Sequence, residues 1–195
     1  MNLHRAVYDG DLFSVQSHIV NYQGNPTIKS LALVLAAATN KPKIVWAFLK
    51  YGVDINKPDH FFGFQRNWES VSIKILHKHW QWRLMPFSHN WTPRLTPLCA
   101  AAFFGHAGIV KMLVDAGADL DFDPYFDEEN YENRPTWNAL TCALLGGNEF
   151  IARYLMYIGA RASDLPEAAK PMAALLLKED RRLPLEMIDH ALSYM

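Results

Sequence analysis

The sequence is short of the features that mark several common classes of protein. It has two cysteines in 195 residues, Cys99 and Cys142, and no C-x-x-C spacing, so it indicates neither a disulfide framework nor a cysteine-based zinc site. The longest apolar run, residues 31–38, is far shorter than the roughly 20 residues that a membrane-spanning helix needs. Acidic residues follow Met1 within the first dozen positions, so no secretory signal is expected.

An excess of charge of one sign is also lacking. Nineteen Lys and Arg residues face twenty Asp and Glu residues, and this balance gives no reason to expect a nucleic acid or an anionic membrane as the partner. No Gly-rich phosphate loop, G-x-S-x-G or H-E-x-x-H motif occurs. We therefore expect no enzymatic activity, no cofactor and no resident metal.

Both cysteines lie in Ala- and Leu-rich stretches with helical periodicity. Such cysteines behave as small buried apolar residues. A disulfide between Cys99 and Cys142 is the weaker alternative, and buried thiols indicate a reducing, cytoplasmic setting.

Residues 96–121 read TPLCAAAFFGHAGIVKMLVDAGADLD, and their order predicts two short helices joined by a tight turn. Thr96 can cap a helix, and Pro97 suits its first position. Gly105 is placed to end that helix in a left-handed conformation, and Gly117 to end a second helix in the same way. The second helix has one apolar stripe, formed by Ile109, Val110, Leu113 and Val114.

This stretch resembles the ankyrin repeat, whose pattern is T-P-L-H-x-A-A, then G-H, a second helix and G-A-D. The chain departs from it at Cys99, which stands where the family has a His that hydrogen-bonds between repeats. The resemblance implies an all-α solenoid of helix-turn-helix repeats. It also implies that this array lacks the polar connection normally made by the His.

Weaker copies of the pattern keep the same register elsewhere. In one copy, Gly147 and Gly159 are placed to end the two helices. In another, Asn40 stands in place of the first glycine, and Asn also tolerates a left-handed conformation. Together they predict a single domain of about four repeats with helical caps and two insertions. The boundaries are an N-cap repeat 1–27, repeat 2 at 28–56, an insertion 57–94, repeat 3 at 95–121, an insertion 122–136, repeat 4 at 137–162 and a C-terminal helical cap 163–195.

The cap is predicted to contain a helix that starts near Pro166, with Asp164 and Glu167 as a capping box. Its apolar stripe comprises Ala168, Met172, Leu175 and Leu176.

The first insertion is rich in aromatic and basic residues, and several interpretations of it remain open. The aromatic residues form a satellite core that packs on the repeats, or they form an exposed surface of the kind enriched at protein–protein interfaces. A metal site at His77 and His79 with His89 or His60 is a third interpretation, although no acidic or Cys ligand completes it. Stacking of nucleic-acid bases is disfavoured by the balanced charge.

The second insertion is acidic and aromatic. It is either a solvated loop, folded against the basic first insertion, or a finger that engages a basic partner. A calcium loop is disfavoured because the required mid-loop glycine is missing.

The resemblance implies a protein–protein interaction module. We expect the chain to be monomeric when free and to bind, and inhibit or sequester, one protein partner through its concave face and insertions, as an immunity protein does. Alternatives are a secreted effector or scaffold adaptor that binds a host protein, or a metal-dependent enzyme using the His-rich insertion. The expected contact residues are Trp80, Trp82, Arg83, Trp91, Arg94, Tyr125, Phe126, Asp127, Glu128 and Tyr131.

Overall fold

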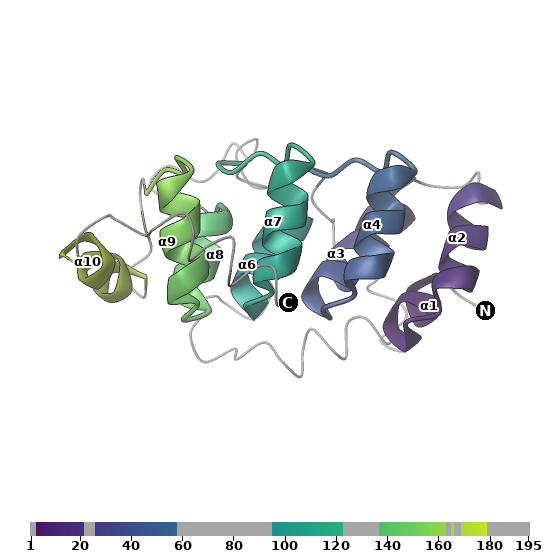
Figure 1. Cartoon of the computed structure of the whole chain (residues 1–195), viewed down its shortest axis with the longest axis horizontal. Helices are drawn as coiled ribbons and strands as arrows, with labels where there is room; N and C mark the ends of the chain where they lie inside the picture. Colours follow the sequence, from purple (N-terminus) through teal and green to yellow (C-terminus); the bar gives the residue numbers. More distant parts are fainter. Residues whose placement is uncertain are drawn as a thin grey trace, which may run out of the picture. The chain divides into compact units, whose positions relative to one another are not determined.

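The computed structural model of the chain describes residues 3–21, 26–57, 95–122, 137–162, 165 and 169–178, with the backbone alone at 26, 27, 177 and 178. All regular structure within these ranges is helical (Figure 1). The chain divides into two compact units, residues 1–97 and 98–195. The predicted all-α class is therefore confirmed for the described part, and each unit is considered by itself below.

The first unit holds two helical hairpins. Helices α1 (Leu3–Asp9) and α2 (Leu12–Asn21) form one, and α3 (Pro26–Ala38) and α4 (Pro42–Lys50) form the other. Helix α1 packs against α3, and α2 packs against α4. The two hairpins therefore stack in sequence order, with α1 and α3 as the inner helices and α2 and α4 as the outer ones (Figure 1).

The second unit contains the hairpins α6 (Pro97–Phe104) with α7 (Ala107–Asp115) and α8 (Ala139–Leu145) with α9 (Glu149–Tyr157). Helix α6 begins at Pro97, as the T-P pair predicts. Helix α10 (Lys170–Lys178) follows and packs on α9. Thus the hairpin of residues 96–117 is confirmed, and a second hairpin repeats it.

The turn inside each hairpin uses one residue with positive φ. These residues are Gly10 (79°), Asn40 (53°), Gly105 (81°) and Gly147 (72°). The residue after each then donates its N–H to a carbonyl five positions back, from Asp11 to Ala6, Lys41 to Ala36, His106 to Ala101 and Asn148 to Ala143. This bond closes the last turn of the inner helix and satisfies a carbonyl that the helix itself leaves open.

Asn40 confirms the prediction made for it. It is the only non-glycine residue of the described part with positive φ. Asn is among the few side chains that adopt this conformation at modest cost, because it is short and polar. The turns after the outer helices follow the same rule, with positive φ at Gly52, Gly117 and Gly159.

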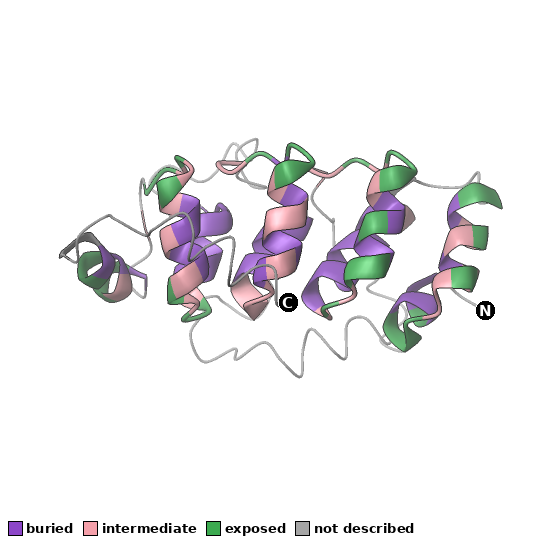
Figure 2. Cartoon of the chain, in the orientation of Figure 1, coloured by how far each residue is buried: buried purple, intermediate pink, exposed green. Residues whose placement is uncertain are grey.

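The core of each unit is made of small and branched apolar residues. Every residue of α3 from Ser30 to Ala38 is buried, as is every residue of α8 from Ala139 to Leu144 (Figure 2). The outer helices are amphipathic instead: in α7, Ile109, Val110 and Leu113 are buried. The predicted stripe holds, except that Val114 is only half-buried. A helix buried on all sides needs small side chains so that its neighbours can approach closely.

The C-terminal helix differs in detail from the expectation. Its buried residues are Ala169, Ala173 and Leu176, whereas Leu175 is 51% exposed. The stripe follows positions 169, 173 and 176, spaced four and three apart, so Leu175 falls beside it. Helix α10 begins at Lys170, and Asp164, Pro166, Glu167 and Ala168 of the expected capping box and stripe lie outside the described residues.

Candidate partner-binding site

The inner helices can be compared at one equivalent position, five residues before the turn residue. Counted from the turn residues, it is Arg5 in α1, Leu35 in α3, Ala100 in α6 and Cys142 in α8. Arg5 is exposed, but the other three are apolar and buried. Within the described part, the accessible residues of the inner helices lie in repeat 1 and at the half-buried helix ends, which are Ile28, Lys29, Phe103, Phe104 and Leu145. A docking surface on the inner helices of the described part would therefore consist of these residues.

The position of the family's His is occupied by a different residue in each repeat: His4, Val34, Cys99 and Thr141. In repeat 3, Cys99 points its Sγ at the main-chain carbonyl of Trp137, 3.6 Å away, as a weak thiol donor. The connection between repeats that the His normally makes is thus replaced by a weaker one rather than lost. In repeat 4, Thr141 is buried, and its Oγ1 makes no hydrogen bond among the described residues.

In repeat 1 this position is occupied by a His after all. His4 is buried in α1, and a hydrogen bond connects it to the backbone of Ile28 in α3. Burial lowers the pKa of His4 below its usual 6.5, and the bond to Ile28 opposes that shift. The signal is present in the sequence, because Leu3-His4-x-Ala6 follows the L-H-x-A part of the repeat pattern, but the prediction for repeat 1 did not include it.

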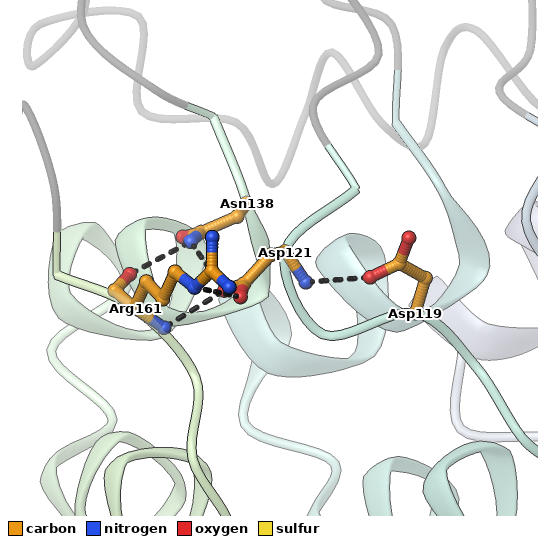
Figure 3. Close-up of polar contacts among 4 residues, drawn as sticks. All are labelled: Asp119, Asp121, Asn138 and Arg161. Atoms are coloured by element: carbon orange, nitrogen blue, oxygen red, sulfur yellow. Dashed lines mark hydrogen bonds and ion pairs between the residues drawn. The ribbon is translucent and has the colours of Figure 1, made fainter.

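The base of the second insertion is built from residues on both sides of it. Asp121 precedes the insertion and Asn138 follows it, and the Nδ2 of Asn138 lies 3.4 Å from an Oδ1 of Asp121 (Figure 3). The same Nδ2 donates to the main-chain carbonyl of Arg161 at 2.9 Å. The chain ends that lead into and out of residues 122–136 are therefore held together by side chains.

Arg161 completes this group of three. Its main-chain N–H donates to Asp121 Oδ1 at 2.8 Å, and its guanidinium Nε lies 3.4 Å from Oδ2 (Figure 3). The guanidinium contributes little, because the Arg161 side chain is 81% exposed. The main-chain N–H donating to a carboxylate is the stronger contact. We call Asp121, Asn138 and Arg161 the insertion clamp.

Two further hydrogen bonds hold residues of the clamp in place. Asn138 is the N-cap of α8, and its Oδ1 accepts the N–H of Thr141 at 2.9 Å. Asp119 Oδ1 accepts the N–H of Asp121 at 3.0 Å, as Asp54 does for Asn56 in repeat 2. The clamp was not predicted from the sequence. The sequence does show that Arg161 stands where repeats 2 and 3 have Asp54 and Asp119.

The contact residues expected from the sequence are not placed by the structure. All ten lie outside the described residues, in the segments 58–94 and 123–136, as do His60, His77, His79 and His89. The structure brings the ends of the second insertion together at the clamp and leaves the two sets of contact residues untested.

The described part also bears on the chemistry available. It contains no cluster of three or more side chains that could ligate a metal. None of its helices combines the length and the apolar character needed to cross a membrane. Cys99 and Cys142 are buried and are not joined in a disulfide, which agrees with the prediction that they act as small apolar residues.

Hairpins that repeat one turn geometry and stack in order define a helical repeat protein. Residues 69–164 match the family model described as ankyrin repeats (3 copies), and the chain belongs to the ankyrin-repeat family. No curated protein matches it. Ankyrin repeats generally mediate protein–protein interaction, and members of the family are typically binding modules without enzymatic activity.

Proposed function

We propose that this protein binds one protein partner and inhibits or sequesters it, with the two insertions as the main contact elements. The observation that carries the proposal is the insertion clamp. Hydrogen bonds among Asp121, Asn138 and Arg161 connect repeat 3 to repeat 4 across the second insertion. The repeat fold does not require this insertion. A loop presented on a rigid base loses less conformational freedom on binding, which favours affinity.

The contact residues proposed for the first insertion are Trp80, Trp82, Arg83, Trp91 and Arg94. Those proposed for the second are Tyr125, Phe126, Asp127, Glu128 and Tyr131. Aromatic and Arg residues supply most of the binding energy at protein interfaces, and the acidic residues would steer a basic partner. The buried inner-helix positions in repeats 2 to 4 support this emphasis on the insertions.

Inhibition of a toxin or enzyme in the cytoplasm is the specific role we favour, and the buried thiols fit a reducing compartment. A scaffold adaptor, or an effector that acts on a host protein, would use the same surface without blocking an activity. The partner's own activity separates these roles. An inhibitor abolishes that activity at one equivalent of the chain, whereas an adaptor leaves it intact.

The test compares wild-type protein with a variant in which Trp91, Arg94, Tyr125 and Phe126 are all alanine. Each is immobilised and exposed to extract of the source organism, and captured proteins are quantified by mass spectrometry. The proposal expects a protein that the wild type captures and the variant loses. The matched control is Tyr157→Ala, which removes an exposed aromatic residue from α9 and should capture that protein normally.

Thermal unfolding of the same variants decides between the two interpretations of the aromatic residues. An unchanged melting temperature in the fourfold variant supports the interpretation that the four side chains contact the partner. A collapse of the melting temperature assigns those side chains to a core, and undiminished capture by the variant overturns the proposal.

A further inference from the structure

The outer helices share a position six residues after the turn that is half-buried in three of them and exposed in α4. It is Gln16 in α2, Trp46 in α4, Lys111 in α7 and Arg153 in α9. In the second unit this position carries a charge that is paired within its own helix. Lys111 lies 3.0 Å from Asp115, and Arg153 lies 2.7 Å from Glu149. Helix α4 breaks this rule with an indole.

Trp46 sits between two lysines on the exposed side of α4. Lys43, Trp46 and Lys50 are spaced three and four residues apart, so they lie along one face. The Trp46 side chain is 51% exposed, and the Nζ of Lys50 lies 5.2 Å from the centre of its ring. This is a cation–π contact, which fixes the indole in place without covering it.

Helix α2 adds an apolar row beside this cationic one. Phe13 is 82% exposed and Val20 is 59% exposed; they are seven residues apart and so share a face. Relative to the turn residues Gly10 and Asn40, Phe13 is equivalent to Lys43 and Val20 to Lys50. Because α2 packs against α4, each apolar side chain of α2 is in register with a lysine of α4. Exposed residues of both helices lie on the same side of the hairpin pair in Figure 2.

No carboxylate neutralises this surface within the described part of the first unit. Neither α2 nor α4 contains an acidic residue. Within the described part, none of the nearby acids forms an ion pair with Lys43 or Lys50, and each makes its contact elsewhere. Asp9 pairs with Arg5 at 2.6 Å, Asp11 accepts the N–H of Ser14 at 3.0 Å, and Asp54 accepts the N–H of Asn56 at 3.0 Å.

From this arrangement we infer a second docking surface, the outer face, formed by Phe13, Val20, Lys43, Trp46 and Lys50. Its partner is an acidic protein segment that also carries apolar side chains. The apolar side chains cover Phe13, Trp46 and Val20, and the carboxylates pair with Lys43 and Lys50. A row of apolar side chains beside a row of unpaired cations is complementary to such an amphipathic acidic segment. This inference goes beyond the proposed function, since it uses different residues and a different class of partner.

The test uses a displayed library of random 16-residue peptides, selected on the full-length protein. Excess soluble Trp46→Lys/Lys43→Glu/Lys50→Glu variant is present as competitor, so that only peptides needing the outer face are retained. The substitution Trp46→Lys reproduces the residue that α7 has at this position, so the helix should accept it. We expect the retained peptides to be net acidic and to contain apolar residues at helical spacing.

Single variants then measure the contribution of each feature to binding of the best retained peptide. Trp46→Lys alone should weaken binding at least about tenfold, the loss typical of a central aromatic contact. Lys43→Glu should weaken it and make it less sensitive to salt. Tyr157→Ala, an exposed aromatic residue on α9, is the matched control and should bind as the wild type does.

Several outcomes would overturn the inference. A library that yields no Trp46-dependent peptides, or peptides with no acidic bias, excludes an acidic segment. Sedimentation that shows self-association of the wild type, lost in Trp46→Lys, assigns the outer face to a second copy. Binding to phosphatidylserine vesicles that depends on Trp46, with no retained peptide, assigns it to a membrane. The fourfold insertion variant tests the proposed function separately and should retain peptide binding.

Discussion

Asn148 reaches from the start of α9 to the end of α6, where its Nδ2 donates to the main-chain carbonyl of Phe103 at 2.6 Å. The same atom donates to Ala102 at 2.8 Å. Carbonyls at a helix C-terminus lack partners within their own helix. The Asn148 side chain thus provides a donor for two carbonyls at the end of helix α6 in repeat 3. It does not cap its own helix, α9.

The first prediction concerns this contact. Asn148→Ala should lower the free energy of unfolding by about 2 kcal/mol, because two hydrogen bonds of about 1 kcal/mol each are lost. Asn148→Asp should lower it at least as much, because a carboxylate has no N–H to donate and brings a charge against two carbonyl oxygens. Urea unfolding of the three proteins measures this. An aspartate variant as stable as the wild type would contradict the role of the amide donor.

The second prediction concerns the close approach beside that contact. A Cβ on Gly146 would collide with the main-chain oxygen of Phe103, whereas its φ of −74° suits alanine. Gly146→Ala should therefore cost about 2–3 kcal/mol through overpacking alone. Asp9→Ala changes the equivalent position of repeat 1 and removes only an exposed ion pair, so it should cost less than about 1 kcal/mol. Equal losses of unfolding free energy in the two variants, measured by chemical denaturation, would show that the backbone at Phe103 moves to accommodate the added Cβ.

The third prediction separates charge from hydrogen bonding in the insertion clamp. Asp121→Asn keeps an acceptor for Arg161 N–H and Asn138 Nδ2 but removes the negative charge, whose partner guanidinium is exposed, so stability should fall by about 1 kcal/mol or less. Asp121→Ala removes the acceptor and should cost about 1–3 kcal/mol. Thermal melts at low and high salt check this. Equal destabilisation by both variants would mean that the negative charge of Asp121 stabilises the clamp and that its role as an acceptor does not.

The fourth prediction concerns pH. Burial lowers the pKa of His4, so the folded protein disfavours its protonated form. The stabilisation from neutral His4 is complete above the usual value of 6.5 and is lost as the pH falls from there toward the lowered pKa. The melting temperature should therefore fall over this interval. His4→Gln should be less stable at neutral pH but should lose less on acidification. If the melting temperature of the variant fell with pH as steeply as that of the wild type, groups other than His4 would cause the acid sensitivity.

The fifth prediction concerns Asn40, with its φ of 53°. Asn40→Ala should lower stability by about 1 kcal/mol, because a Cβ is strained in the left-handed region and alanine lacks the polar group that offsets this. Asn40→Gly should be neutral or stabilising by a few tenths of a kcal/mol. Denaturant midpoints of the two variants, with an unchanged m value, measure the difference. A more stable alanine variant would contradict the backbone argument.

Much of each hairpin could be predicted from the sequence because its determinants are local. Pro97 at a helix start, Gly105 and Gly117 at helix ends and the apolar spacing of Ile109 and Leu113 each act within a few residues of the chain. Asn40 was correctly placed for the same reason. The prediction for Leu175 was wrong because the face that α10 buries depends on how it packs against α9, and periodicity alone allows either choice.

The contacts between repeats were decided by tertiary structure. Asp121 and Arg161 are 40 residues apart, and Asn148 and Phe103 are 45 apart; no local pattern specifies such pairs. The exposure of Trp46 is of the same kind, since an indole at helical spacing reads equally well as core. The amino-acid sequence by itself determined where the hairpin helices end and turn, because those preferences lie in single residues and their near neighbours. Only stacking decided which polar groups meet and which apolar side chains stay uncovered, because both depend on distances across the fold.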